Sequence, residues 1–589
     1  QVRKLRAIEG VSVRLKETWQ AAGGASAALI CLLVSAPVAA DGPTPGDELL
    51  QRATALLSPP GQPSQGEGEF AGRRRATLVL NEIQSLRDVF DPKDIEPLTP
   101  FLARPADLKA QIETAHFRIH YSTTGADAPL GWPSCAFLDA AAEACERAWI
   151  TYHHLQGWAV PPSDGEAGGD GRVDVYVRDL GWGIYGYALH EDSPGRGSKS
   201  GFIVVENDYA GFDRIEPLDA LRTTLAHEYH HLIQFGFGYD PEAGWFMEQT
   251  ATMEEGEVFP EIRDLDRYLQ FHTAHAYRRL DLCNGSFEYG AWLWPRYLEE
   301  RWGWALLMDT WETWGREGLM MKEALDDGLM RVGSSLEEAY LGWATWNLFL
   351  GERDDGAHYQ RGSAYFPEVL AESSVDLYPL AALHPQPTRQ PAALGASYVE
   401  LRPQEGSADN HIEISLQACE TLIGASLVVW DAPGQVREIR PITTPGGMAL
   451  IQVVNWSSVE RACLVLANGA DAQQSCDYVI SAETHYERSD IEPGIDLAAG
   501  LMLRSAPNPF EAHTIISFQL PEPAESKLQI FDAQGRLVRT LVNGPCSQGS
   551  HAVFWNGQDD LGQRALAGVF YGRLYSQLVR KQIRIVRIR

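Results

Sequence analysis

The chain has 589 residues, of which 44% are hydrophobic and 22% charged, and its formal net charge is −30. This length predicts several domains, and the apolar content excludes wholesale disorder. Binding to nucleic acid requires a basic face, so the acidic balance argues against a nucleic-acid partner and against attraction to an anionic membrane surface. We therefore expect a globular protein with several domains.

The first 40 residues have the pattern of a secretory signal peptide. A basic stretch that ends at Lys16 is followed by an apolar run at 27–34, and small residues precede Asp41. The apolar run is too short to span a bilayer comfortably. We therefore predict a signal peptide over 1–40, no transmembrane anchor, and a protein that is secreted or held at the outer surface of a bacterial cell.

Cysteine usage is compatible with export. Seven of the eight cysteines follow the predicted signal peptide, and the chain has no CxxC pair. Because exported proteins commonly form disulfides, we expect one or two, with Cys419, Cys463 and Cys476 as candidates. A cysteine-based zinc site is not expected.

Residues 41–111 combine a linker with a helical segment. The stretch 58–66 is rich in Pro, Gly, Ser and Gln, whereas 75–102 has apolar residues mostly three and four positions apart. Two interpretations stay open. The helical part is either a pro-segment that covers an active site or the first layer of the domain that follows.

From residue 112 the pattern becomes α+β. Alternating runs predict strands at 117–121 and 172–178, with helical periodicity over 138–155 between them. A strong helix is predicted over 217–236, and further helices are expected between 243 and 350. We assign residues 112–385 to this α+β domain.

The C-terminal third is predicted to be all β. Short alternating runs at 396–401, 426–430 and 449–454 are separated by Gly and Pro turns, which indicates a β-sandwich over 390–490. Residues 500–589 repeat this pattern as a second β-sandwich domain of Ig-like type. The expected fold class is therefore a multidomain chain with an α+β domain followed by two all-β domains.

The helix over 217–236 carries the segment His227-Glu-Tyr-His-His231. Side chains four positions apart lie one above the other on a helix, so His227 and His231 can bind one zinc ion. Glu228 follows the first ligand and is placed to act as a general base toward water at that ion. This is the HExxH arrangement of zinc hydrolases, and it makes the α+β domain a candidate zincin-like catalytic domain.

Glu248 is the candidate third ligand. Sixteen residues separate it from His231, which leaves room for a turn and a second helix that returns to the metal. A metzincin would need Gly and His where Gln234 and Phe237 stand. Asp240 lies close to the helix end, and we interpret His230 as a surface residue or an indirect neighbour of the metal.

Two later glutamates are also rejected as ligands. Glu254 and Glu255 fall on an increasingly polar face of the second helix. The expected metal site is therefore His227, His231 and Glu248, with Glu228 as the catalytic base.

These residues resemble the gluzincin group of zinc peptidases. Over about 112–350 the chain also resembles a family of exported bacterial metalloproteases, through the segments Phe117-Arg-Ile-His-Tyr, Gly169-Asp-Gly-Arg-Val-Asp-Val-Tyr, Ala226-His-Glu-Tyr-His-His-Leu-Ile-Gln-Phe, Trp245-Phe-Met-Glu and Tyr289-Gly-Ala-Trp-Leu. The resemblance implies the same zinc ligands and base. Thermolysin-like enzymes place an Asp four residues after the Glu ligand; here that position is Thr252, so the partner that orients His227 is unassigned.

Two further sites are weighed. Tyr289 is the candidate that stabilises the oxyanion, with His272 and His275 as rivals, and a role as an ordinary core tyrosine stays open. The loop 164–174 offers several carboxylates that could hold calcium, but it lacks the EF-hand spacing, and a solvated turn is the preferred interpretation.

The C-terminal region resembles the Ig-like sorting domain of bacterial proteins secreted by the type IX system, which is related to a domain of flagellar hook-capping proteins. The resemblance rests on Ala506-Pro-Asn-Pro-Phe, Ile530-Phe-Asp-Ala-Gln-Gly-Arg-Leu, Trp555-Asn-Gly-Gln-Asp-Asp and Gly568-Val-Phe-Tyr. It implies the secretion machinery as a partner. A β-sandwich without a sorting role stays open.

The function expected from these patterns is that of a secreted zinc-dependent metallopeptidase, acting on a protein or peptide substrate. Two alternatives stay open. One is a surface adhesin or scaffold whose zincin-like domain has no activity, and the other is a zinc hydrolase of non-peptide amides or esters.

Overall fold

The computed structural model describes residues 45–57 and 76–588, except 182, 192–196, 211, 213–214, 420–421, 432–434, 441–447, 470–473, 487–502, 507, 511–512, 521–522, 533–534 and 577–579. The predicted signal peptide and the linker at 58–66 lie outside these residues. No helix in the described part of the chain is both long and apolar enough to cross a membrane.

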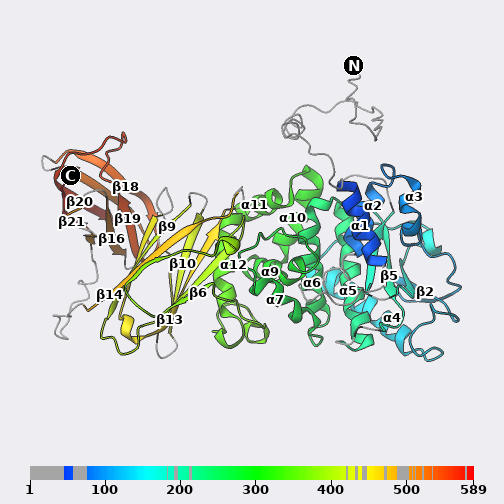
Figure 1. The fold of residues 1–589 in the computed structure, drawn as a ribbon. Coiled ribbons are helices and arrows are strands. Elements are labelled where there is room, and N and C mark those ends of the chain that lie inside the picture. The colour runs from blue at the N-terminus through cyan, green and yellow to red at the C-terminus, as the bar shows by residue number, and fades with distance from the viewer. Residues whose placement is uncertain are drawn as a thin grey trace, which may run out of the picture. The chain divides into compact units, whose positions relative to one another are not determined.

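A five-stranded sheet forms the N-terminal half of the α+β domain (Figure 1). Its strands are β1 (Ala110–Glu113), β2 (Phe117–Tyr121), β3 (Val173–Arg178), β4 (Gly186–His190) and β5 (Gly201–Glu206). The order is β1-β2-β3-β5-β4, in which β2, β3 and β5 run parallel and β4 is an antiparallel edge strand. The strands predicted at 117–121 and 172–178 are confirmed.

Both faces of this sheet are covered, which follows from the alternation of side chains along each strand. Ile119, Val175 and Ile203 pack against the helices of the main core. Tyr176, Phe202 and other residues on the opposite face pack against the N-terminal segment. A sheet covered on both faces needs apolar residues at nearly every position of its central strands, as β5 shows.

The helices that follow carry most of the domain. They are α4 (Ala136–Trp149), α5 (Pro217–Phe237), α6 (Gly244–Val258), α7 (Leu269–Thr273), α8 (Phe287–Gly290), α9 (Leu293–Trp302), α10 (Trp304–Glu317), α11 (Met321–Arg331) and α12 (Leu336–Trp346). Helix α5 packs against α4, α6, β4 and β5, so it lies at the centre of the domain. The bounds of α5 confirm the helix predicted over 217–236.

The N-terminal segment forms α1 (Pro45–Leu57), α2 (Ala76–Ser85), α3 (Pro92–Ile95) and a 3-10 turn at Glu96–Phe101. The helical spacing over 75–102 continues through these pieces, but the helix ends at Ser85 and restarts at Pro92 because proline suits the first turn of a helix. Apolar residues of α2, α3 and the 3-10 turn share a core with one face of the sheet.

The first β-sandwich has two sheets with the orders β11-β10-β13-β8-β6 and β12-β9-β14-β7. Its strands are β6 (Ser373–Val375), β7 (Leu380–Leu383), β8 (Ala396–Leu401), β9 (His411–Ala418), β10 (Leu422–Asp431), β11 (Gln435–Ile439), β12 (Met448–Val454), β13 (Val459–Asn468) and β14 (Tyr478–His485). Strands β6 and β7 precede residue 385, so the sandwich begins earlier than the sequence pattern indicates. Both are too short to show a clear alternation.

A disulfide joins Cys419 and Cys476 across the ends of β9 and β14. Two of the three candidate cysteines therefore form the bond. The third, Cys463, is a buried free thiol of β13 in the other sheet.

Replacing both Cys419 and Cys476 by Ser is expected to destabilise the first sandwich. The bond closes a loop over a sequence separation of 57 residues, for which loop-closure entropy gives roughly 4 kcal/mol. Denaturant unfolding followed by tryptophan fluorescence measures the loss, because Trp456 lies in this core. The exposed free thiol Cys135 offers a control, since Cys135→Ser should leave the transition unchanged. Equal midpoints for the double variant and the parent would contradict the prediction.

The C-terminal domain consists of two further sheets, β15-β16-β19 and β18-β17-β20-β21 (Figure 1). The strands are β15 (Leu503–Ala506), β16 (Thr514–Leu520), β17 (Ala524–Asp532), β18 (Leu537–Cys546), β19 (Gly549–Trp555), β20 (Gly568–Ser576) and β21 (Arg580–Arg587). Trp555, Ile530 and Phe570 are buried in one core between them. The second all-β domain is confirmed.

Candidate metal centre

Helix α5 positions the first two candidate ligands. Pro217 occupies its first turn and Asp219 complements the positive end of the helix dipole. From Leu225 onward the helix is buried for more than two turns, so it holds the polar side chains of the HExxH segment inside the protein. The imidazole rings of His227 and His231 lie one turn apart, with their centroids 4.7 Å from each other.

Helix α6 brings in the third candidate ligand. The chain leaves α5 through Gly238, whose φ of 136° favours glycine, and Asp240 caps the short turn before α6 by accepting a hydrogen bond from the Glu242 amide. Asp240 is thus a capping residue. Glu248 lies in the first half of α6 and is fully buried.

The three side chains converge on one point. One ligand atom from each of His227, His231 and Glu248 lies within 4.8 Å of the others. His227 Nε2 is 3.2 Å from Glu248 Oε2, and His231 Nε2 is 3.6 Å from Glu248 Oε1. Tetrahedral zinc with bonds of about 2.0–2.1 Å separates its ligand atoms by about 3.3 Å, so the spacing fits this ion.

Two polar atoms of this group have no hydrogen-bond partner although they are buried: His231 Nε2 and Glu248 Oε1. An unsatisfied buried polar atom is costly, and a cation between the two would satisfy both. Burial lowers the pKa of His231 to about 4, which keeps its imidazole in the neutral form that binds metals. The donor set therefore fits zinc.

The charges of the other two ligands follow from their neighbours. Burial opposes ionisation of Glu248, but His231 and His227 hold its pKa below the ordinary value. Burial also opposes protonation of His227, but Glu248 and Glu255 raise its pKa to about 10. Binding of zinc at His227 would therefore release a proton.

Each histidine is oriented by a hydrogen bond at its other nitrogen. His227 Nδ1 lies 2.9 Å from Glu255 Oε1, and His231 Nδ1 lies 2.7 Å from Gln234 Oε1. The Gln234 amide in turn donates to the Met247 carbonyl and to the Thr250 hydroxyl of α6. Such partners fix the ring orientation and leave Nε2 directed at the metal.

The sequence did not reveal these orienting residues, and the expectation for Glu255 is wrong. Glu254 and Glu255 were expected on a polar face, whereas both are fully buried because α6 is enclosed on nearly all sides. Glu255 is the partner of His227 Nδ1 that the sequence left unassigned. The available signal was spacing: Glu255 follows Glu248 by seven residues, or two helical turns, so the two share one face.

Glu255→Gln is expected to weaken zinc binding by about 10–100-fold, because an orienting partner has an effect of this size. Competition with a chromophoric chelator measures the affinity. Glu254→Gln is the matched control: Glu254 is the adjacent buried glutamate, bonded to Gln156 and Trp158, and burial raises its pKa well above the ordinary value, so Gln imitates its neutral form. Equal affinities for both variants would contradict the orienting role.

Glu228 lies beside this centre with its carboxylate buried. Its Oε2 accepts a hydrogen bond of 2.8 Å from the hydroxyl of Thr77 in α2. Burial raises the pKa of Glu228 to about 7, although the charge of His227 and the Thr77 hydrogen bond oppose this rise. A carboxylate with a pKa near neutrality suits a general base.

Tyr289 is brought to the site, and its two rivals are not. The Tyr289 ring centroid is 6.2 Å from that of His227, and the proximity of the Tyr289 side chain contributes to lowering the pKa of Glu248, after the larger effects of His231 and His227. His272 packs against Phe287 and Trp343, and burial lowers its pKa to about 3. The ring of His275 lies near Phe271 and Tyr277.

His230 is a core residue, which corrects the surface alternative of the two roles expected for it. It is fully buried, and its ring contacts Trp158 and Tyr152 edge-on. Burial lowers its pKa well below the ordinary value. His230 precedes His231 by one position on α5 and so lies off the face that carries His227 and His231, in a different layer of the core.

Three carboxylates of the loop 164–174 are paired with basic side chains. Arg104 bonds to both Asp164 and Asp174, and Arg118 bonds to Asp170. Asp174 also lies 2.7 Å from His120. In the described part of the chain, the three-residue group suited to a metal ion is the one around His227, so the structure gives these carboxylates a role in ion pairs.

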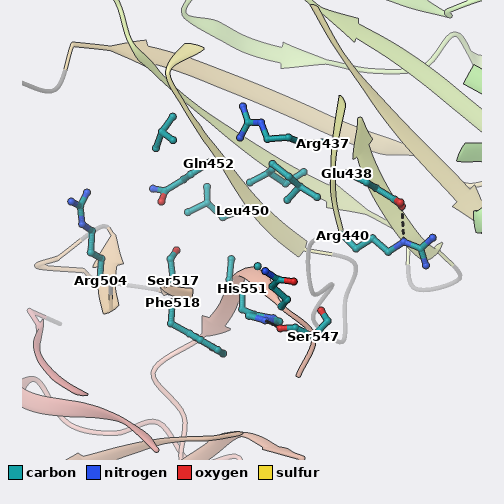
Figure 2. A pocket seen from close by; sticks show the side chains of 16 residues that line it. Arg437, Glu438, Arg440, Leu450, Gln452, Arg504, Ser517, Phe518, Ser547 and His551 are labelled. Carbon is teal, nitrogen blue, oxygen red and sulfur yellow. Dashed lines mark hydrogen bonds and ion pairs between the residues drawn. The ribbon is translucent and has the colours of Figure 1, made fainter. Parts of the chain in front are cut away.

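A pocket elsewhere in the chain is lined by residues of both β domains, among them Arg437, Leu450, Phe518 and His551 (Figure 2). Figure 2 shows the labelled polar side chains distributed around the pocket, with an ion pair between Glu438 and Arg440. It contains none of the zinc ligands proposed above.

Comparison with curated proteins gives no match to this chain. Among solved structures, a similar one is PorZ, described as an essential bacterial surface component of the type-IX secretion system of Porphyromonas gingivalis. It is 26% identical over 15% of this chain and 11% of its own, with a TM-score of 0.12.

Two further solved structures are similar over larger parts. A β-1,2-glucanase from Parabacteroides distasonis is 11% identical over 37% of this chain and 38% of its own, with a TM-score of 0.14. Dimeric latent PorU from Porphyromonas gingivalis is 9% identical over 33% of this chain and 32% of its own, with a TM-score of 0.13. In all three cases this chain spans well under half of the solved chain.

One family matches part of the sequence. The match covers residues 505–576 of this chain, from the end of β15 through β20. The family is the FlgD Ig-like domain, so this multidomain protein carries an Ig-like domain in its C-terminal region.

Proposed function

We propose that the protein is a zinc-dependent metallopeptidase with a zincin-like, gluzincin-type catalytic domain. The observation that carries the proposal is the convergence of His227, His231 and Glu248. Each histidine ring is oriented by a hydrogen bond at its Nδ1 atom, and two buried candidate ligand atoms have no hydrogen-bond partner. A structural ion cluster would satisfy its own polar atoms, whereas this arrangement leaves them directed at one point.

The roles of the chain's own groups follow from their positions. Zinc, when bound, supplies Lewis-acid chemistry at the ligand cluster. Glu228 lies next to the first ligand and would take a proton from the attacking water and pass it to the departing amine. Tyr289 lies beside Glu248 and His227. Its hydroxyl is the candidate donor to the oxyanion of the tetrahedral intermediate.

Export is supported by two features outside the catalytic domain. The disulfide Cys419–Cys476 requires an oxidising compartment in most organisms. The C-terminal domain matches the FlgD Ig-like domain family over 505–576, and we infer that it serves as a sorting domain recognised by a secretion system. The protein would then act outside the cell or at its outer surface.

Metal analysis combined with hydrolysis of casein tests the peptidase proposal. We expect one zinc per chain, and casein hydrolysis that a chelator stops and added zinc restores. An ester such as p-nitrophenyl acetate serves as the comparison substrate. Hydrolysis of the ester without the peptide would favour a non-peptide hydrolase. Bound zinc without either activity, both in the intact chain and after removal of residues 1–89, would favour a scaffold.

A further inference from the structure

Strand β4 is the edge of the catalytic sheet nearest the metal centre. It pairs with β5 on one side and contacts α5, which carries the HExxH segment. The other side of an edge strand presents backbone amides and carbonyls to which an extended peptide can add as a further strand. In β4 the relevant groups belong to Ala188 and His190.

Helix α2 takes up these backbone groups. The Ala188 amide donates to the Thr77 hydroxyl at 3.1 Å, and the Ala188 carbonyl accepts from the Asn81 amide at 2.8 Å. The His190 amide donates to Asn81 Oδ1 at 2.9 Å. Thr77 and Asn81 lie four residues apart on one face of α2, so the helix places one polar side chain per turn along the strand.

The same helix also reaches the catalytic base. Thr77 accepts from the edge strand and donates to Glu228 Oε2 at 2.8 Å, so one hydroxyl links the strand to the active site. The site is closed in this state. Exposed fractions are 5% for His227 and 4% for Glu228, and both Glu248 and His231 are fully buried.

A permanent cover for the strand edge would explain the bonds to Ala188 and His190, since sheets commonly protect their edges. It does not explain why the cover binds the carboxylate that must receive a proton. Helix α2 thus takes up both the backbone groups of β4 that an extended peptide would pair with and one oxygen of the Glu228 carboxylate. The two contacts together therefore indicate an occupant of the substrate site.

We propose that α2 holds the enzyme latent, by occupying the edge of β4 at which an extended peptide substrate pairs and by binding the general base. This inference rests on the proposed peptidase function. The substrate is accordingly a peptide that presents its backbone in extended form, and α2 must leave before it binds. The turn that follows α2 is accessible, with 74% of Val89 exposed, so a cut there would separate α2 from the sheet.

The first test uses Asn81→Ala in the full chain. Loss of two hydrogen bonds to β4 is expected to raise the open fraction, and with it casein hydrolysis, by about 10-fold. Ser85→Ala is the matched control, because Ser85 lies on the same face of α2 but contacts the His190 side chain instead of the strand backbone. Thermal unfolding shows whether Asn81→Ala stays folded. A folded variant with parental activity would overturn the proposal.

The second test does not depend on the stability of a substitution. A recognition sequence for a site-specific protease is inserted after Val89, the zinc-loaded chain is cut, and the N-terminal fragment is removed by size exclusion. A scrambled insertion is the control. Casein hydrolysis is expected to rise at least about 10-fold after the cut. Equal activity before and after removal of the fragment would overturn latency.

Binding of a fluorescent peptide hydroxamate to the same zinc-loaded preparations separates this inference from the proposed function. Binding only after the cut, without hydrolysis of casein, would keep α2 as the occupant of the site and overturn the peptidase. Equal binding before and after the cut would overturn α2 as the occupant. Binding to neither form would also overturn it, because removal of α2 must open the zinc site.

Discussion

Glu228→Gln is expected to lower casein hydrolysis by about 10³-fold, within the range of 10²–10⁴ that general acid–base catalysis contributes. The amide keeps the size of the side chain and can still accept a hydrogen bond from Thr77, but it cannot take a proton from water. Because Glu228 is not a ligand, the variant should retain one zinc per chain. Rates are compared in the intact chain and after removal of α2, so that latency does not hide the effect.

Glu206→Gln is the matched control for this substitution. Glu206 is also a buried glutamate of the catalytic domain, and burial raises its pKa to about 7, as for Glu228. It accepts hydrogen bonds from the Leu180 and Asn207 amides at the end of β5 and does not touch the metal centre. Similar losses in both variants would show a general effect of altering a buried carboxyl group and would remove the support for Glu228 as the base.

Glu248→Ala is expected to weaken zinc binding by more than about 100-fold, which exceeds the effect of losing an orienting partner. The substitution removes a ligand atom and leaves His227 and His231 without the carboxylate that lies 3.2 Å and 3.6 Å from them. Zinc content after dialysis and chelator competition measure the loss, and hydrolysis should fall with it.

The control for the ligand is again Glu254→Gln, which alters a fully buried glutamate of the same helix. It should retain one zinc per chain. Retention of zinc by Glu248→Ala with parental affinity would show that another group supplies the third bond, and the proposed ligand set would then be wrong. A circular dichroism spectrum equal to that of the parent shows that the fold is intact.

The convergence of His227, His231 and Glu248 could be predicted from the sequence because the information is local. His227 and His231 share one face of one helix, and Glu248 follows after a short turn into the next helix. Helix periodicity and the cost of burying a charge are enough to bring such residues together. The same holds for β2, β3 and the longer strands of the sandwiches, whose alternation is visible in the sequence.

The contacts that complete the site could not be predicted in this way. Thr77 and Glu228 are 151 residues apart, and no periodicity indicates that they meet. Glu255 lies in a run of acidic residues that looks like a solvated surface, although tertiary packing encloses it. The two interpretations of the N-terminal segment likewise depend on its packing: α2 is a layer on the sheet and also reaches the catalytic base.

The packing of α12 against the first sandwich has a consequence for the boundary of the catalytic unit. Tyr398 of β8 donates its hydroxyl to the Ala344 carbonyl of α12 at 2.8 Å, and one continuous apolar core includes residues of α12, β10 and β13. A chain that ended at residue 385 would leave β6 and β7 without partner strands and would expose this core to water. The smallest piece able to fold with the proposed catalytic domain therefore extends to the end of β14, and the first sandwich completes the core of that domain instead of serving as a spacer.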